Sequence, residues 1–383
     1  MNRYNQSFIF QDLQQKMVFI GGPRQVGKTT LSKALCKNEF ARGVYLNWDA
    51  KIDRGIILKE QWRTDVPLII FDELHKYPKW KQWVKGIYDT KMINQHFLVT
   101  GSARMDTYRR GGDSLMGRYH YWRLHPLTLD ELPLGMSTDE GLERLLTLGG
   151  FPEPFLAGDE RQARRWRRER FDRILQEDIR DLEMIRHVAL LGLFTEALQS
   201  RAGSLITLSN LAEDLQISPK TAKNWLTLIE RMYIAFAIYP LTKNIPRSIQ
   251  KPPKVYFYDN ADLQTNDGGR LENLVATHLL KRLHFIEDYH GYRCSLHYIR
   301  DKDGREVDFV TIINGVVIDL IEVKKSDPSV SSSLLYYTRL LQPKRSIQLV
   351  YDLKKTFQIE QVLVTNLADY FQTPPWNINS KEL

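Results

Sequence analysis

A glycine-rich segment near the start of the chain has the residue spacing of a phosphate-binding loop. The segment GGPRQVGKT carries the pattern G-x-x-x-x-G-K-T on Gly22, Gly27, Lys28 and Thr29. Glycines let the backbone curl so that its N–H groups face a phosphate, while the lysine reaches the β- and γ-phosphates and the hydroxyl binds Mg²⁺. ATP and Mg²⁺ are therefore the expected cofactors. The expected nucleotide-binding residues are Gly22, Pro23, Arg24, Gln25, Val26, Gly27, Lys28, Thr29 and Thr30.

Two acidic residues end an apolar run further along the chain. Residues 68–71 have the composition of a buried strand, and Asp72 and Glu73 follow directly. An acid at this place can hold Mg²⁺ through water, and the next acid can polarise the attacking water. The alternative is that both acids cap the helix that follows. The phosphate-binding loop upstream favours the catalytic interpretation.

Two further residues of this half could act on a γ-phosphate. The apolar run in HFLVTGSARMD breaks at Thr100, Gly101 and Ser102, and its strand is expected between the loop strand and the acid strand. Ser102 is the first choice for a group that senses the γ-phosphate, and Thr100 is the second. Arg118 precedes another predicted strand and could stabilise transition-state charge in its own subunit or in a neighbouring one. The alternative is an ordinary surface arginine.

A second set of candidate catalytic residues lies near the end of the chain. In the segment VVIDLIEVKKS, Glu322 and Lys324 are two residues apart, so they share one face of a strand. Asp308 lies on the preceding strand and Glu272 in the first turn of a preceding helix. Asp308 and Glu322, with Glu272, could hold one or two Mg²⁺ ions, and Lys324 could orient a water molecule against a phosphodiester. The alternative is an ion pair on a solvated strand face.

The turn between these two strands sets a condition on that second site. An Asn-Gly dipeptide at 314–315 predicts a two-residue hairpin turn. Such a turn without any irregularity places Asp308 opposite Ile321, and therefore on the face away from Glu322. A shared site thus requires a bulge or a kink in this hairpin.

The middle of the chain has the pattern of a DNA-binding element. Two short helical patterns flank a tight break, and Ser218 with Pro219 has the signature of a helix start. Two strand-like runs follow, so the segment predicts a winged helix. Its second helix is expected to expose residues suited to phosphates and base edges, namely Lys220, Lys223, Asn224 and Thr227. A purely structural packing module is the alternative.

An arginine-rich segment, RQARRWRRERFDR at 161–173, supplies much of the chain's basic character. One interpretation is a solvated helix that turns Trp166, Phe171 and Ile174 inward. The other is a surface that tracks nucleic-acid phosphates.

The bulk composition is that of a globular protein with more than one domain. The chain has 383 residues, 43% of them hydrophobic, and a net charge of +8 with a pI near 9.2. The positive charge weakly favours an anionic partner such as nucleic acid. Cys36 and Cys294 have neither disulfide-framework nor metal-ligand spacing, and no apolar run is long enough for a bilayer. A cytoplasmic location without a membrane partner is therefore expected.

The order of several motifs resembles a large family of prokaryotic AAA-type ATPases. These motifs are GGPRQVGKTT, FDELHKYPKW, VTGSARM, MGRYHYWRLHPLTLDEL and GGFPEPFL. The family carries a C-terminal domain of unknown function that is partly nuclease-like, and its physiological task is seldom known. The C-terminal pattern D…E-V-K with a preceding helix glutamate also resembles the PD-(D/E)xK nuclease superfamily.

Residues and resemblance together predict an α/β protein of four parts. They are a P-loop ATPase domain over 1–135, a helical lid over 136–200, a winged helix over 201–262 and a nuclease-like α/β domain over 263–383. The expected function is that of an ATP-hydrolysing ATPase that acts on DNA, with a homo-oligomer allowed. The alternative is a nucleotide-dependent switch or scaffold whose tail cuts nothing. A metabolite kinase is disfavoured, because the acid pair and Ser102 suit hydrolysis and no acceptor site is evident.

Overall fold

The computed structural model describes residues 3–40, 42–63, 65–92, 94–101, 115–175, 188–242 and 251–373. Contacts divide the chain into two compact units, Met1–His125 and Pro126–Leu383. The four-part division expected from the sequence is finer than this split and stays a prediction. Over the described ranges, no helix combines the length and apolar character needed to cross a bilayer.

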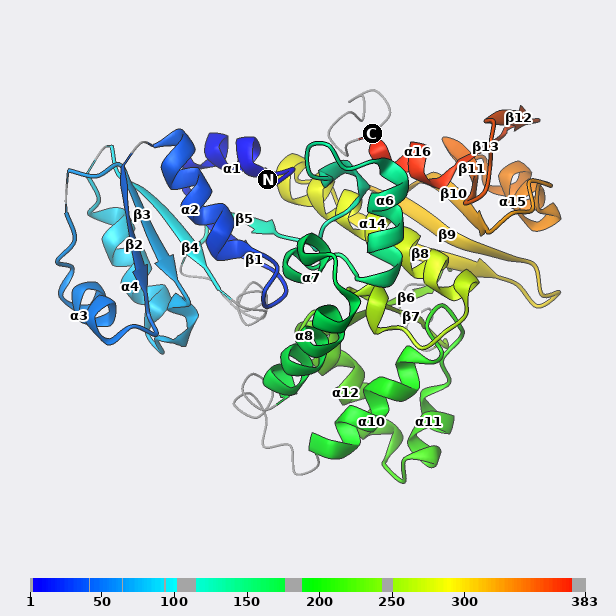
Figure 1. The fold of residues 1–383 in the computed structure, drawn as a ribbon, viewed down its shortest axis with the longest axis horizontal. Coiled ribbons are helices and arrows are strands. Elements are labelled where there is room, and N and C mark those ends of the chain that lie inside the picture. The colour runs from blue at the N-terminus through cyan, green and yellow to red at the C-terminus, as the bar shows by residue number, and fades with distance from the viewer. Residues whose placement is uncertain are drawn as a thin grey trace. The chain divides into compact units, whose positions relative to one another are not determined.

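The first unit is built on a five-stranded parallel sheet with the strand order β2-β3-β4-β1-β5 (Figure 1). Its strands are β1 (Met17–Gly21), β2 (Gly43–Asn47), β3 (Leu68–Asp72), β4 (His96–Thr100) and β5 (Tyr119–Arg123). The expected position of β4 between the loop strand β1 and the acid strand β3 is confirmed. Because all five strands run in parallel, the end of each strand lies at the same edge of the sheet.

Helix α1 precedes the first strand, and the helices after it supply crossovers that a parallel sheet requires. The first helix is α1 (Gln6–Leu13), and the crossover helices are α2 (Lys28–Glu39), α3 (Lys51–Lys59) and α4 (Trp80–Asp89), with a 3₁₀ turn η1 (Leu74–Lys76) after β3. One buried cluster is markedly aromatic. It includes Phe19, Trp48, Phe71, Trp80 and Phe97. Strands β1 and β3, on either side of the central strand β4, are buried throughout, which explains their unbroken apolar composition.

The second unit starts with the 3₁₀ turn η2 (Leu129–Glu131) and three helices, α6 (Thr138–Thr147), α7 (Pro152–Ala157) and α8 (Glu160–Arg173). Helix α8 contains the arginine-rich segment. Trp166 and Ile174 are buried as expected, whereas Phe171 is only half-buried. Arg170 was not expected inside, yet it is buried with its guanidinium 3.9 Å from the centre of the Phe151 ring. The exposed arginines of α8 are Arg161, Arg164, Arg165, Arg168 and Arg173.

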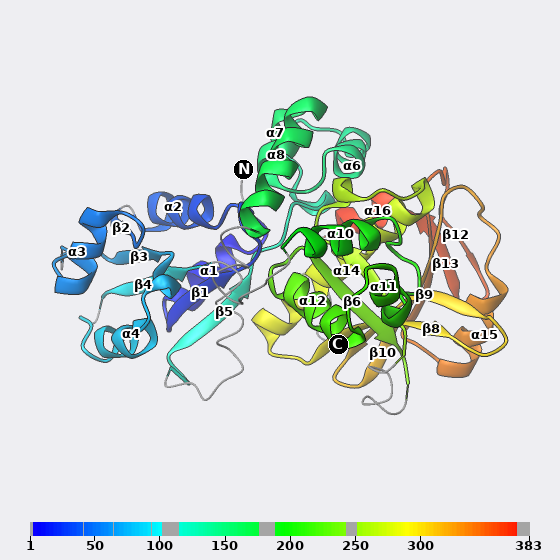
Figure 2. The same cartoon turned by 90° about the horizontal axis from the view of Figure 1, so that it is seen from below.

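Three helices and a two-stranded ribbon follow, of which the sequence predicted the last two helices and the ribbon in this order. They are α10 (Val188–Gln199), α11 (Leu208–Asp214), α12 (Pro219–Arg231), β6 (Ala235–Pro240) and β7 (Lys254–Phe257). The Ser218 hydroxyl accepts a hydrogen bond from the Thr221 N–H and so caps α12. The helices gather beside β6, against which α12 packs (Figure 2).

An eight-stranded mixed sheet carries the rest of the second unit, in the order β12-β13-β11-β10-β9-β8-β6-β7. The additional strands are β8 (Cys294–Arg300), β9 (Glu306–Ile313), β10 (Val316–Lys324), β11 (Arg345–Val350), β12 (Phe357–Ile359) and β13 (Val362–Asn366). Its helical elements are η4 (Asn260–Asp262), α14 (Asp267–His290), α15 (Ser332–Leu341) and α16 (Leu367–Gln372). The long helix α14 packs along β8, β9 and β10 (Figure 1).

Helix α14 starts earlier than the sequence suggested. Asn266 caps it and Asp267 is its first residue, so Glu272 lies in the second turn rather than the first. His278 is a core residue, as expected for a histidine on an apolar stripe. Its Nε2 accepts a hydrogen bond from the Leu129 N–H and its Nδ1 lies 2.8 Å from the Leu274 carbonyl oxygen. Burial lowers the pKa of His278 to about 3, so the ring is neutral.

The hairpin of β9 and β10 contains the irregularity that the second candidate site requires. Asn314 and Gly315 both have positive φ, and the two-residue turn pairs Ile313 with Val316. The register then shifts between Val317 and Asp319, so that Ile321 pairs with Phe309. Continued by one residue, the register places Asp308 opposite Glu322. The expectation of a bulge is confirmed, and the two acids face one another because of it.

Candidate functional site

The phosphate-binding loop has a backbone that glycine makes possible. Gly22 and Gly27 have φ values of 134° and 97°, and Gln25 also has a positive φ of 65°. A Cβ atom at Gly22 would lie 2.3 Å from the carbonyl oxygen of Leu124, which is closer than any real contact. Helix α2 begins immediately after Gly27, so its N–H groups point into the loop. The curled loop is therefore a consequence of glycine at these two positions.

The Lys28 ammonium lies inside the loop. Its Nζ donates hydrogen bonds to the carbonyl oxygens of Gly22, at 3.0 Å, and Pro23, at 2.7 Å, and the residue is 7% exposed. Outside the loop, Arg3 donates from Nη1 to the carbonyl oxygen of Val26 at 2.9 Å. The sequence did not predict this contact of Arg3, because a lone arginine before the first helix forms no recognisable motif.

Asp72 joins the loop to the acid strand through hydroxyl groups. Its Oδ2 accepts hydrogen bonds from the hydroxyls of Thr29, at 2.8 Å, and Tyr45, at 2.5 Å. Its Oδ1 accepts a hydrogen bond from Thr100. The Thr29 hydroxyl and the Asp72 carboxylate are oxygen ligands of the type that Mg²⁺ prefers. These residues therefore fit the expected ion. Burial and the Asp72 carboxylate raise the pKa of Tyr45, which stays protonated.

Glu73 follows in a backbone conformation that is rare for a residue with a side chain. Its φ is 56°, in the left-handed region, and strain of this kind is concentrated at functional sites. Its Oε2 lies 3.4 Å from the Lys76 Nζ and 3.7 Å from the His75 Nε2. Burial raises the pKa of Glu73 despite Lys76 and Lys28 nearby, which makes it a better proton acceptor than a solvated carboxylate.

The two remaining candidates of this half have different outcomes. Ser102 lies outside the described residues. Arg118 lies at the start of β5, whereas the phosphate-binding loop follows the end of the neighbouring strand β1. Five strand residues separate the two edges by about 13 Å, and Arg118 forms a two-point ion pair with Asp89 at 2.7 and 3.0 Å. Within its own subunit Arg118 is therefore remote from the loop, and its catalytic role stays a prediction.

The C-terminal candidates do come together, but with a partner that the sequence did not reveal. Lys254, the first residue of β7, is 3% exposed. Its Nζ lies 3.0 Å from Glu272 Oε1, 2.7 Å from Glu306 Oε1 and 3.8 Å from Asp308 Oδ1. We name these four residues, with Glu322 and Lys324, the acid cluster. A lone lysine at the start of a short strand carries no sequence signal for such a role.

Other contacts complete the acid cluster. The Tyr256 hydroxyl donates to Glu272 Oε1 at 2.6 Å, and the Val323 N–H donates to Asp308 Oδ2 at 2.9 Å. Lys324 pairs with Glu322 Oε1 at 2.8 Å. Glu322 Oε2 is buried and has no hydrogen-bond partner in the described part of the chain.

The electrostatics of the acid cluster reflect an excess of carboxylates over ammonium groups. Burial, and then the Asp308 carboxylate, raise the pKa values of Glu272 and Glu322 to about 7 each. Burial also raises the pKa of Asp308. Burial alone would lower the pKa of Lys254, but the surrounding carboxylates outweigh it and raise this pKa above its usual range. Lys254 is therefore a permanent cation.

The expected metal site does not form. Within the described ranges, no three His, Cys, Asp or Glu side chains are grouped so that they could hold a metal ion. The expectation that Asp308 and Glu322 bind Mg²⁺ with Glu272 is therefore not met by this arrangement. The physical reason is that the Lys254 ammonium already lies beside two of these carboxylates, 3.0 Å from Glu272 Oε1 and 3.8 Å from Asp308 Oδ1.

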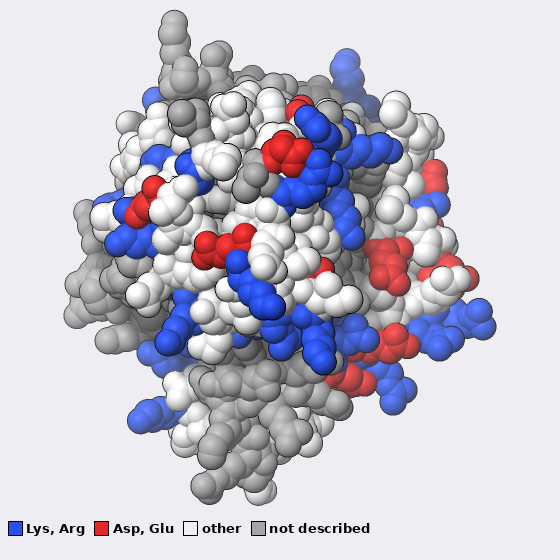
Figure 3. Space-filling model, turned by 90° about the vertical axis from the view of Figure 1, so that its left-hand side faces the viewer, with Lys and Arg blue, Asp and Glu red and all other residues white. Residues whose placement is uncertain are grey.

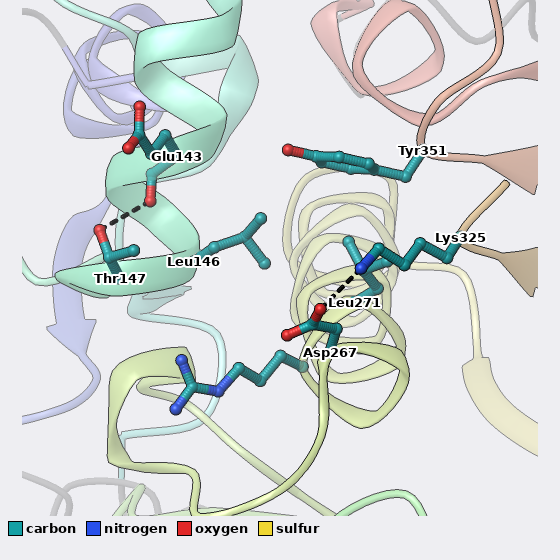
Figure 4. A pocket seen from close by; sticks show the side chains of 8 residues that line it. Glu143, Leu146, Thr147, Asp267, Leu271, Lys325 and Tyr351 are labelled. Atoms are coloured by element: carbon teal, nitrogen blue, oxygen red, sulfur yellow. Dashed lines mark hydrogen bonds and ion pairs between the residues drawn. The ribbon is translucent and has the colours of Figure 1, made fainter.

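A cavity of about 250 Å³ lies elsewhere in the second unit, where α6, the start of α14 and the segments after β10 and β11 meet (Figure 4). Lys325 and Tyr351 reach into it, and Lys325 pairs with Asp267 at 2.7 Å. The full lining is Glu143, Leu146, Thr147, Asp267, Arg270, Leu271, Lys325 and Tyr351. Neither sign of charge dominates this lining, and no sequence motif pointed to it.

The surface of the predicted reading helix is as expected. Lys220, Lys223, Asn224 and Thr227 of α12 are all exposed, while Trp225 on the same helix is buried. On the face drawn in Figure 3, Lys and Arg alternate with Asp and Glu.

Three family models match successive parts of the chain. Residues 14–133 match an AAA domain, and residues 139–265 and 267–370 match two domains of unknown function, DUF8612 and DUF4143. The AAA match supports an AAA-type P-loop ATPase, as the motifs suggested. It leaves the winged helix and the nuclease-like tail as proposals.

Relatives that match most of the chain are distant. The chain is 24% identical to Uncharacterized protein Rv2008c of Mycobacterium tuberculosis over 369 residues, covering 93% of this chain and 81% of the relative. It is 23% identical to Uncharacterized protein MJ1637 of Methanocaldococcus jannaschii over 384 residues, covering 84% and 78%.

Solved structures are similar only at a low level. A Thermotoga maritima RuvB Holliday junction branch migration motor matches with a TM-score of 0.30 and 15% identity, over 64% of this chain and 93% of that chain. A Bacteroides Pif1 bound to ssDNA matches with a TM-score of 0.22 and 15% identity, over 39% and 46%. Scores of this size carry no argument about function.

The geometry of the loop predicts the effect of one added methyl group. Gly22→Ala should weaken ATP binding at least about tenfold, because the new Cβ would meet the Leu124 carbonyl and the residue would keep a strained φ. Gly55→Ala is the matched control, since a Cβ there meets nothing within 4 Å. Titration with a fluorescent ATP analogue measures both. Equal affinities for the two variants would contradict the assigned loop geometry.

Proposed function

We propose that this protein hydrolyses ATP at the edge of the parallel sheet in its first unit. The observation that carries the proposal is the convergence of Lys28, Thr29, Asp72 and Glu73 at that edge, where the Thr29 hydroxyl at the start of α2 donates to Asp72 at the end of β3. The match of residues 14–133 to an AAA domain supports the same conclusion.

The residues of the chain have separate roles in this proposal. The loop N–H groups bind the phosphates, and Lys28 exchanges its hydrogen bonds to Gly22 and Pro23 for bonds to the β- and γ-phosphates. Thr29 and Asp72 would hold Mg²⁺, which supplies neutralisation of phosphate charge when it is bound. Glu73, with its raised pKa, orients the attacking water and accepts its proton.

Other groups at this site support the proposed chemistry. Tyr45 and Thr100 orient Asp72 through their hydroxyls. Ser102 remains our proposed sensor of the γ-phosphate. Since Arg118 lies at the far edge of its own sheet, we propose that it contributes from a neighbouring subunit, which requires a homo-oligomer.

The second unit is proposed to bind nucleic acid through a winged helix. The order of α10, α11, α12 and the β6–β7 ribbon supports this assignment, as does the exposure of Lys220 and Lys223 on α12. The net charge of +8 favours a polyanionic partner. DNA is the proposed partner.

Two roles are proposed for the tail, which has the helix–hairpin order of a PD-(D/E)xK nuclease. In the first, the tail cleaves a phosphodiester with Asp308, Glu322 and Lys324. In the second, the tail is nuclease-like in shape only, and the protein is a nucleotide-dependent switch or scaffold. The burial of Lys254 among the acids favours the second role, because metal-dependent cleavage needs those carboxylates for metal.

The first test concerns the ATPase. Lys28→Ala should lower the rate of phosphate release at least about 100-fold, since a cation at the γ-phosphate is lost. Lys37→Ala is a suitable control, because Lys37 is exposed on the same helix. Wild-type turnover in the Lys28 variant, measured by a coupled phosphate assay, would refute the assignment.

The second test concerns nucleic acid. The double variant Lys220→Ala/Lys223→Ala should bind double-stranded DNA about tenfold more weakly and reduce the salt slope of binding by about 2, because two phosphate contacts are lost. Fluorescence anisotropy at several salt concentrations measures both quantities. Lys302→Ala, an exposed lysine outside α12, provides the comparison. An unchanged slope would mean that α12 does not contact DNA.

The third test decides between the two roles of the tail. Single- and double-stranded DNA and RNA are incubated with Mg²⁺ or Mn²⁺ and either the wild-type protein or Lys324→Ala. If the tail does not cut, the two proteins give the same background, which is the expected result. Cleavage by the wild-type protein alone would establish the nuclease role.

A further inference from the structure

A buried lysine occupies the place where the nuclease resemblance predicts a metal ion. The Lys254 Nζ lies within 3.0 Å of oxygens from Glu272 and Glu306 and 3.8 Å from Asp308. A divalent cation such as Mg²⁺ or Mn²⁺ is typically bound by several carboxylate oxygens that surround one point. In this chain, the ammonium group provides the positive charge.

Neighbouring segments of the chain also hold Lys254 and Glu272 in place. Lys254 belongs to β7. Its backbone pairs with Ile238 of β6 and forms an antiparallel β-bridge with Leu205. The Tyr256 hydroxyl, two residues further along β7, binds the same oxygen of Glu272 as Lys254 does. At Gly203 a Cβ would lie only 3.3 Å from the Glu272 carboxyl group. The lysine is thus held by its strand and does not project from a free loop.

We propose that Lys254 is the resident cation of the acid cluster, that it excludes a divalent metal from these carboxylates, and that it fastens the β6–β7 ribbon to α14 and β9. The proposal deepens the second role of the tail and rests on it. Because β6 packs against α12, the same ion cluster connects the proposed DNA-binding element to the nuclease-like sheet.

The balance of charge shows what removal of Lys254 would do. The acid cluster has four carboxylates, on Glu272, Glu306, Asp308 and Glu322, and two ammonium groups, on Lys254 and Lys324. Glu322 Oε2 already lacks a hydrogen-bond partner in the part of the chain that the structure describes. Without Lys254, three carboxylates lose their compensating charge, which is strongly destabilising unless another cation replaces it. A divalent cation with oxygen ligands suits that position.

The experiment measures Mn²⁺ binding to the full-length protein without nucleotide, by electron paramagnetic resonance of free Mn²⁺. Wild-type protein should bind no more Mn²⁺ than Asp308→Asn does. Lys254→Met should bind Mn²⁺ at least about tenfold more tightly than wild type. Adding Asp308→Asn to Lys254→Met should remove that gain, and Lys302→Met should behave as wild type does. A bound Mn²⁺ in wild-type protein that Asp308→Asn abolishes would overturn the proposal.

Stability provides a second readout. The thermal midpoint of Lys254→Met should fall relative to wild type and recover when Mn²⁺ is added, whereas the wild-type midpoint should not respond. If Lys254→Met does not fold, the double variant Lys254→Met/Glu306→Gln is used instead. It loses one positive and one negative charge, so the net charge of the cluster is unchanged. A folded variant that binds no additional Mn²⁺ also refutes the proposal. Neither readout uses ATP or DNA, so failure here is distinguishable from failure of the proposed ATPase or of DNA binding.

Discussion

The hydrogen bond between Thr29 and Asp72 holds the first unit's site together. It joins the first turn of α2 to the end of β3, two segments 43 residues apart in sequence. The bond exists because β1 and β3 run in parallel and end at one edge, with β4 between them. Tyr45 and Thr100 reach the same carboxylate from the two strands beside β3, so Asp72 is oriented from several directions. Such support is what a carboxylate needs if it is to hold a metal ion in one position.

The second unit solves a different electrostatic problem. Its carboxylates are buried together, and buried charges of one sign must be neutralised by protons, by a metal or by a cationic side chain. The structure uses two of these means, since Lys254 lies among the acids and the pKa values of Glu272 and Glu322 rise to about 7. A helix and a hairpin that bring several acids together therefore do not by themselves imply a metal centre. The same helix–hairpin arrangement can serve as an internal ion cluster that joins a ribbon to a sheet.

A site whose residues are close in sequence can be predicted from the sequence, whereas a site assembled from distant residues often cannot. The phosphate-binding loop is a local motif, because Gly22, Gly27, Lys28 and Thr29 are close in sequence and act through a single turn of backbone. Arg3 and Tyr45 serve the same site from other elements, and neither has a local signature. Asp308 and Glu322 form an intermediate case. The sequence indicated both acids and the condition for their meeting, a bulge in the hairpin, and the register shift at Ile318 satisfies that condition.

The sequence by itself determined the loop, the acid strand, the helix–turn–helix order and the period-two strand of Glu322 and Lys324, because each depends on neighbouring residues and backbone periodicity. Only the tertiary structure decided that Arg118 lies at the far edge of its sheet and that Lys254 lies among the acids. Those positions depend on how strands distant in sequence are ordered and paired, which no local spacing encodes. The burial of a charge is likewise a property of the packed molecule, so the exclusion of a metal from the acid cluster could be inferred only after the fold was known.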